Sequence, residues 1–180
     1  MHTKRTLLAL AVMLSLIGCG GGGGGGDGAP EAGTCSTERV ITVNPSTLLD
    51  PTPFGYKHIS LDTSTGIAYV AGQVAFSLEG KIVGGTLKEQ LVLVEKNLRF
   101  ALGDLDAGVE DIIRMNTFVK NFQQDPDLAT LEPFLFSMGS PVNAVLGVSS
   151  LAIDALLVEV QMTVAVTPET VEKIRCGING

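Results

Sequence analysis

Few side chains in this 180-residue chain could perform acid–base, nucleophilic or metal chemistry. Once a cleavable N-terminal segment is set aside, His58 is the remaining histidine. A histidine-rich zinc site needs several such ligands, and a Ser-His-Asp triad would depend on His58 alone. No Walker A loop is present. A run of glycines follows residue 19, but no helix follows that run, so it cannot form a phosphate-binding loop. We therefore expect no metal, no cofactor, and His58 as a surface or core residue.

Two of the three cysteines flank the part of the chain that is expected to fold. Cys35 lies just before it and Cys176 just after it. In an oxidising compartment, cysteines placed in this way suggest a disulfide between the two ends of the domain. Two free thiols on frayed termini are the alternative that the sequence leaves open.

The third cysteine, Cys19, follows a hydrophobic leader. A basic pair precedes an apolar run from Leu7 to Ile17, which is shorter than the roughly 20 apolar residues of a membrane-spanning helix. Such a run is typical of a secretory signal peptide. It ends in Leu-Ile-Gly-Cys, which resembles the lipobox at which bacterial lipoproteins are cleaved and lipidated. We predict a signal peptide over residues 1–18 and a lipid on Cys19; an ordinary secretory signal with a chance cysteine is the alternative.

Residues 19–34 are predicted to form a flexible tether. Seven consecutive glycines follow Cys19, and nothing in the segment could bury apolar surface. Gly20 rather than Asp follows the cysteine, which under the usual sorting pattern favours the outer membrane over the inner one. We therefore expect a protein of the bacterial cell envelope that is attached to a membrane by its lipid and faces the periplasm.

Residues 35–180 have the length of one domain. They contain few aromatic residues and many Val, Leu, Ile and Ala, which predicts an aliphatic core. The whole chain has a formal net charge of -7. A nucleic-acid binder needs a basic stripe that displaces counterions, and the sequence has none. Nucleic acid is therefore not an expected partner.

The hydrophobic pattern of the domain predicts strands interspersed with two helices. Thr86 followed by Glu89 forms a capping-box pattern ahead of an amphipathic helix that ends near Gly103. A second helix is expected to begin at residues 125–127. The predicted strands are residues 57–62 and 66–74, joined as a hairpin, then 112–119, 142–148 and 156–166, of which the last is predicted to be the longest.

The last predicted strand indicates how the sheet is covered. Alternate residues from Leu156 to Val166 are all apolar, as expected beneath two helices, whereas the other side carries polar residues such as Glu159. Two helices can cover only one face of a small sheet. Ile113, Val119 and Val145 would add exposed apolar surface to the other face, so we expect that face to contact another subunit.

Several segments resemble those of the RidA (YjgF) family. Residues 70–74 resemble the family's S-G-Q segment, and residues 108–119 are close to its E-D-[IV]-[VI]-K-x-T run. Residues 141–151, followed by residues 158–160, fit the spacing of its C-terminal signature. The matches keep the family's order and cover nearly all of residues 53–166. The resemblance implies an α+β, chorismate-mutase-like single domain with a mixed β-sheet and two helices packed on one face, assembled as a homotrimer.

The resemblance also implies a small-molecule site at each subunit interface. Active family members hydrolyse enamines or imines derived from amino acids, releasing ammonia and a 2-keto acid. An arginine in their P-A-R-S signature holds the substrate carboxylate, because a guanidinium offers it a planar, charged fork. Aligning the signature proline places the neutral Asn143 at that position. Glu159 and Tyr56 match the family's glutamate and tyrosine and are the candidate catalytic residues. The candidate binding residues are Asn143, Gly72 and Gln73.

Asn143 leaves two hypotheses open. Losing the charged partner of a buried carboxylate commonly costs about 2–5 kcal/mol of binding. The first hypothesis is therefore a module that binds a small metabolite in an intersubunit cleft without the usual deaminase activity. The second is a divergent enamine or imine hydrolase that retains Glu159 and Tyr56. Lys57 or Arg114 could supply a substitute cation, or could be solvated strand residues.

Overall fold

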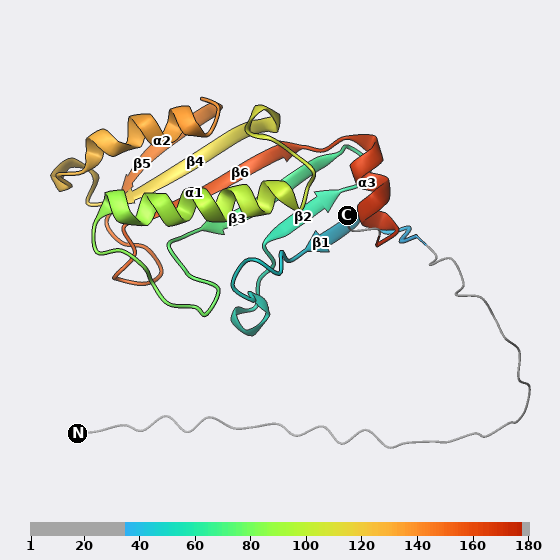
Figure 1. Ribbon diagram of the computed structural model, residues 1–180, viewed down its shortest axis with the longest axis horizontal. Coiled ribbons are helices and arrows are strands. Elements are labelled where there is room, and N and C mark those ends of the chain that lie inside the picture. The colour runs from blue at the N-terminus through green and yellow to red at the C-terminus, as the bar shows by residue number, and fades with distance from the viewer. Residues whose placement is uncertain (1–34, 178–180) are drawn as a thin grey trace, which may run out of the picture. The chain divides into compact units, whose positions relative to one another are not determined.

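The computed structural model describes residues 35–177, which form a six-stranded mixed sheet and three α-helices (Figure 1). The predictions for the signal peptide over residues 1–18, for Cys19 and for the tether over residues 19–34 lie outside the described residues. Within the described range, no helix is both long enough and apolar enough to cross a membrane. The strands are β1 (Val40–Val43), β2 (Ile59–Asp62), β3 (Ile67–Gln73), β4 (Ile112–Lys120), β5 (Val142–Val148) and β6 (Val158–Ala165), and the helices are α1 (Leu87–Gly103), α2 (Leu131–Ser137) and α3 (Pro168–Arg175).

The strand order places β1 and β5 at the two edges of the sheet. The order is β1-β2-β3-β6-β4-β5. β5 pairs with β4 in parallel, and every other pairing is antiparallel. α1 and α2 lie across the same face of the sheet (Figure 1). We call that face the covered face and the opposite one the open face. The predicted mixed sheet with two helices on one face is confirmed.

Local sequence signals explain where α1 begins and how β2 turns into β3. The side chain of Thr86 accepts a hydrogen bond from the backbone N–H of Glu89, and the Glu89 carboxylate accepts one from the N–H of Thr86, both at 3.2 Å. The predicted capping box and the helix end at Gly103 are confirmed. In the hairpin turn, Gly66 has a φ of 69°, and a Cβ there would lie 2.7 Å from the carbonyl oxygen of Val166. This turn therefore depends on glycine.

The core lies between the covered face and the two helices. On β6, Val158, Val160 and Val164 have no exposed surface, so the alternation predicted for this strand is confirmed. α1 contributes an apolar stripe at the spacing of an amphipathic helix. The buried residues of that stripe are Leu87, Leu91, Val94, Leu98 and Ala101.

Two predicted element lengths were wrong. β4 is the longest strand with nine residues, and β6 has eight. β6 is shortened at its start because the N–H of Leu157 donates to the side chain of Gln90 on α1 at 2.8 Å.

α2 begins at Leu131, after a short 3-10 turn, and not at residues 125–127. Pro133 explains this start, because proline lacks an N–H and is accommodated in the first turn of a helix but not in its interior.

A β-bulge at the start of β4 makes the predicted position of Val119 wrong. The register between β4 and β6 shifts between Ile112 and Arg114, so Ile113 and Arg114 are both exposed. Beyond the bulge the alternation changes phase, and Val119 is fully buried on the covered face. Ile113 is 44% exposed, as predicted. Val145 is 37% exposed, but its register with β4 places it on the covered face.

The two ends of the domain are joined by the predicted disulfide between Cys35 and Cys176, which is confirmed. The N–H of Ser36 also donates to the carbonyl of Arg175 at 2.7 Å. This junction holds the segment before β1 against the end of α3. Neither β1 nor α3 was predicted, although Thr167 caps α3 and a proline follows it, which is a recognisable helix start.

Candidate functional site

Two of the predicted site residues, Glu159 and Tyr56, lie close enough for the charge of one to affect the other. Glu159 is on β6, where it pairs with Phe118 of β4. Tyr56 lies in the segment between a short 3-10 turn and β2. The pKa of the Tyr56 phenol is raised, first by burial and then by the charge of Glu159. The two side chains therefore interact across the segments that carry them.

Gly72 makes room for the Glu159 side chain. The register between β3 and β6 shifts between Val70 and Gln73, which marks a bulge around Gly72. A Cβ built on Gly72 would lie 2.5 Å from Cδ of Glu159. The carboxyl group therefore occupies space that any other residue at this position would fill. The predicted binding residue Gly72 thus has a steric role next to a predicted catalytic one.

The environment of Glu159 suits proton transfer. Burial raises the pKa of its carboxyl group, and a hydrogen bond with Gln161 partly opposes that rise. A carboxylic acid with a raised pKa exchanges its proton nearer to neutral pH, as a general acid or base requires. Tyr56, with its own raised pKa, stays protonated and remains a hydrogen-bond donor. Together these groups could polarise a carbonyl or imine and move a proton.

Gln73 and His58 form a buried polar pair behind this site. Gln73 is 3% exposed, and its amide nitrogen donates to Nδ1 of His58 at 3.3 Å and to the carbonyl of Ala71 at 3.0 Å. Nε2 of His58 lies 2.7 Å from the carbonyl of Leu49 and donates to it. Both ring nitrogens are therefore used within the fold, and His58 is a core residue. A cavity of about 10 Å³, the size of one water, lies beside this pair and Tyr56.

Asn143 lies on the opposite face of the sheet from Glu159. It pairs with Met115 of β4, which is fully buried under the helices, whereas Glu159 pairs with Phe118, three positions further along β4. Successive residues of a strand point to opposite faces, so an odd separation places the two partners on different faces. The structure thus separates Asn143 from Glu159 and Tyr56 within one chain.

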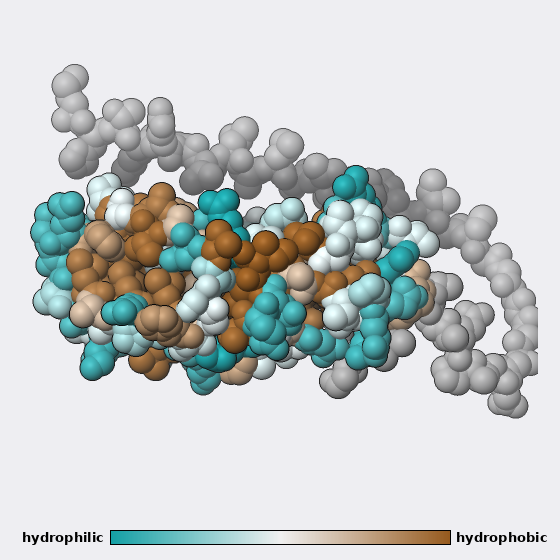
Figure 2. Space-filling view, turned by 90° about the horizontal axis from the view of Figure 1, so that it is seen from above, coloured by the Kyte–Doolittle hydropathy of each residue, from teal (hydrophilic) through white to brown (hydrophobic). Residues whose placement is uncertain are grey.

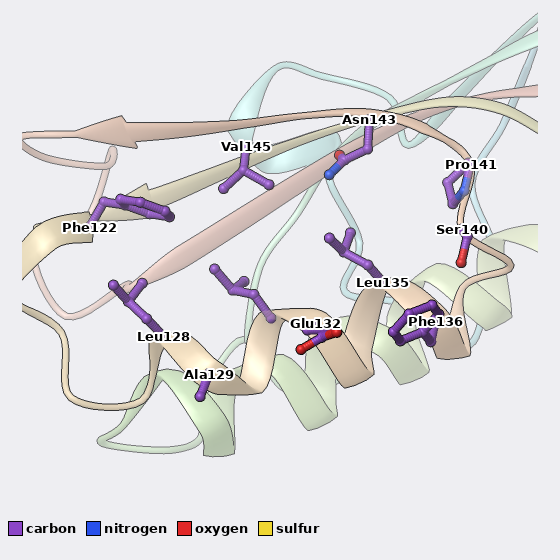
Figure 3. Close-up of a pocket in the computed structure, with 11 residues that line it drawn as sticks. Phe122, Leu128, Ala129, Glu132, Leu135, Phe136, Ser140, Pro141, Asn143 and Val145 are labelled. Atoms are coloured by element: carbon purple, nitrogen blue, oxygen red, sulfur yellow. The ribbon is translucent and has the colours of Figure 1, made fainter.

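Asn143 lines a groove between α2 and the edge strand β5, which we call the α2–β5 groove. Its volume is about 640 Å³. Figure 3 shows Asn143 directed from β5 toward α2, with Glu132 on the helical wall. Seen from the α2 side, hydrophobic side chains gather on this part of the surface (Figure 2). Its lining includes Leu128, Leu131, Glu132, Leu135, Asn143 and Val145.

Neither cation considered from the sequence lies in the groove. Lys57 lines a shallow depression of about 410 Å³ on the open face, together with Tyr69 and Gln161. Arg114 is exposed on the open face beside the β4 bulge. The groove itself contains no Lys, Arg or His. Within the described residues of one chain, neither predicted substitute cation therefore lies in the groove that Asn143 lines.

The sequence reasoning missed the helical half of this groove. Glu132 and the leucines of α2 were expected only as part of an amphipathic helix. The tertiary structure adds the position of β5 at the edge of the sheet, where it lies next to α2 and forms the other side of the groove. Within residues 35–177, the one cluster of possible metal ligands is Cys35, Glu172 and Cys176, and its two sulfurs are joined to each other.

A family model described as endoribonuclease L-PSP matches residues 52–166, well over half of the chain. The chain belongs to this family. Solved members include proteins that are described as belonging to the Rid family and to the YjgF family. The matched range contains every candidate catalytic and binding residue named above. The resemblance inferred from the sequence motifs is confirmed at the level of the family.

Relatives of the L-PSP family agree with this assignment. The chain is 24% identical over 116 residues to the mitochondrial protein MMF1 of Saccharomyces cerevisiae, covering 64% of this chain and 79% of that protein. It is 24% identical over 132 residues to a 2-iminobutanoate/2-iminopropanoate deaminase of Dermatophagoides farinae, covering 73% and 98%.

Solved structures confirm the fold. A Rid-family protein of Yersinia pestis, YyfB, is 32% identical, covers 72% of this chain and 100% of its own, and has a TM-score of 0.51. An L-PSP protein of Entamoeba histolytica has a TM-score of 0.62 at 18% identity. The match covers 71% of this chain and 99% of that protein. The predicted chorismate-mutase-like α+β fold is therefore confirmed.

Proposed function

We propose that this L-PSP-family protein binds a small molecule in clefts between the copies of a homotrimer. Each cleft combines the α2–β5 groove of one copy with Glu159 and Tyr56 of a neighbouring copy. One observation carries the proposal: Asn143 and Glu159, which match two site residues of the same family cleft, lie on opposite faces of one sheet. A single chain cannot present both to one ligand, whereas two chains can.

Features of both surfaces support a second copy at this place. β5 is an edge strand, so among residues 35–177 no strand pairs with its outer side. The open face carries apolar side chains that water would otherwise contact. The exposed ones on β3, β4 and β5 are Tyr69, Ile113, Val142 and Leu146.

We propose further that a lipid on Cys19 attaches the protein to a bacterial membrane. The proposed location is the outer membrane, on the side that faces the periplasm. The lipobox-like Leu-Ile-Gly-Cys sequence supports the lipid. The Cys35–Cys176 disulfide is compatible with an oxidising compartment. In cells fed labelled palmitate, wild-type protein should carry the label and Cys19→Ser should not. Equal labelling of both would overturn the anchor.

Subunit mixing tests the composite cleft. Light scattering of the chain from Cys35 onward should give a trimer, and a clean monomer would overturn the proposal. The probe is 4-methylpentanamide, and its binding is followed by NMR. Asn143→Ala and Glu159→Ala each remove one half of every cleft, so each variant alone should bind weakly. Trimers that contain both variants regain clefts with both halves and should recover binding. No recovery, although native mass spectrometry shows mixed trimers, would contradict a cleft shared between copies.

A divergent enamine or imine hydrolase is the second candidate function. The raised pKa of Glu159 favours it, because a half-buried carboxyl group next to Tyr56 can act as an acid or base. The D. farinae relative is described as an imine deaminase. Turnover of enzymatically generated imines that Glu159→Ala abolishes would support hydrolysis. RNA is a weaker candidate despite the family's description, because a net charge of -7 disfavours contact with phosphates.

A further inference from the structure

We infer that the α2–β5 groove selects neutral or positively charged ligands and disfavours carboxylates, the reverse of a site built around an arginine. The inference rests on the proposed function, because it names the ligand class of the same cleft. Three features carry it: the orientation of the Asn143 amide, the charge of Glu132, and the lack of any basic side chain in the lining.

The orientation of Asn143 is set by a hydrogen bond behind the groove. The hydroxyl of Thr117 donates to Oδ1 of Asn143 at 3.3 Å, and Thr117 is fully buried. The amide oxygen is therefore engaged with β4. The NH₂ group is left for the groove, and it points toward α2 (Figure 3). An NH₂ group donates hydrogen bonds but carries no charge, so it suits a carbonyl or amide oxygen.

Glu132 supplies the charge of the groove. It is the one ionisable side chain among the lining residues, and it is an exposed residue of α2. A carboxylate here repels an anionic ligand and attracts an ammonium group. In the proposed cleft, Glu159 of the neighbouring copy adds a second acidic group. No guanidinium or ammonium of the lining offsets either one.

The remaining walls define the body of the ligand. Leu128, Leu131 and Leu135 of the helical side face Val145 of β5 across the groove. The volume of about 640 Å³ is within the range of small-molecule sites, which are mostly apolar with a few polar groups that fix orientation. The expected ligand therefore has a compact hydrocarbon body, an oxygen acceptor directed to Asn143, and a neutral or cationic group near Glu132.

Three probes with the same carbon skeleton test the charge preference. They are 4-methylpentanamide, 4-methylpentylamine and 4-methylpentanoate, titrated at pH 7 into the trimer while the NMR signals of groove residues are followed. The amide and the amine should bind about two- to fivefold more tightly than the carboxylate, which is the range expected of an exposed charge pair.

Two variants assign the preference to named side chains. Glu132→Gln should weaken binding of the amine by about fivefold and leave binding of the amide unchanged. Asn143→Arg should make the carboxylate the tightest of the three probes. The control is Glu169→Gln on α3, at the other edge of the sheet, which should change none of the affinities.

The outcomes separate this inference from the proposed function. Equal affinities for all three probes, or tightest binding of the carboxylate by the wild type, would overturn the charge preference while leaving the composite cleft intact. Failure of every probe to shift a groove signal at millimolar concentration would overturn both. A fivefold effect of Glu169→Gln would show that net charge, and not Glu132, governs binding.

Discussion

The two faces of the sheet differ in how completely one chain satisfies them. On the covered face, the side chains of β6 pack against α1 and have almost no exposed surface. On the open face, the neighbouring residues of the same strand are partly exposed, and they include the half-buried Glu159 with its raised pKa. A face that is fully packed serves stability. A face that combines apolar patches with a perturbed acid is what a second copy or a ligand would complete.

The α2–β5 groove is the exception on the covered face. It lies between α2 and the edge strand β5, where Asn143 and Val145 of the covered face line an open groove and not the packed core. One groove and one open face can therefore form a site that belongs to two chains, even though each chain folds around a complete core. The predictions below test that division.

The largest expected effect comes from a change that should affect both faces alike. Replacing Cys35 and Cys176 by serine opens a link between residues 141 positions apart. In the chain-entropy model this lowers the free energy of unfolding by up to about 5 kcal/mol, measured by urea denaturation. The disulfide is at the β1 edge and the groove at the β5 edge, so probe binding by the folded protein should be unchanged. If the fully folded serine variant bound the probe more weakly than the wild type, the disulfide and the groove would not be independent of each other.

Neighbouring residues of β6 provide the sharpest contrast between the faces. Met162→Ala removes a buried side chain of the covered face and should lower the free energy of unfolding by about 3 kcal/mol. Thr163→Ala, on the open face, should change it by less than about 0.5 kcal/mol. Urea denaturation at several protein concentrations measures both. Equal losses in dilute solution would show that the open face is packed within one chain.

Gly72→Ala should damage the site more than the fold. Its Cβ would collide with the Glu159 carboxyl, which is flexible and can rotate away, so the loss of stability should be about 1 kcal/mol. The displaced carboxyl should weaken probe binding, or imine turnover if it occurs, by about tenfold. The control is Gly103→Ala, where nothing lies within 4 Å of the new Cβ. Unchanged site function in Gly72→Ala would remove Glu159 from the cleft.

The smallest expected effect is a pH dependence of stability. The folded-state pKa of Glu159 is raised by burial, so the protonated form is favoured by folding. Its contribution to stability is complete below the ordinary glutamate pKa and is lost as the pH rises through the raised value. Relative to Glu159→Gln, the wild type should therefore lose stability between acid and neutral pH, by less than about 1 kcal/mol because the group is only half-buried. If the wild type instead gained stability relative to Glu159→Gln as the pH rises, burial would not be the dominant effect on the pKa of Glu159.

Much of the fold followed from signals that are local in the sequence. The capping box at Thr86, the stripe of α1 and the apolar alternation of β6 depend on residues a few positions apart, so they were predicted correctly. β1 was missed because no short turn joins it to the next strand, whereas β2, equally short, was recognised from its hairpin with β3. Val119 was misplaced because a bulge depends on the pairing of β4 with β6, which no single strand encodes.

The candidate site divides in the same way. The sequence by itself determined the family, which is confirmed, and it supplied Asn143, Glu159 and Tyr56 as candidate site residues, whose roles stay predictions. It could not determine that Asn143 and Glu159 face opposite sides, since that depends on the registers of β5 and β6 against β4. It also could not place Glu132 and Asn143 in one groove, because a helix and an edge strand meet only when the chain folds. Residue types are fixed by the gene, whereas their proximity is a property of long-range packing.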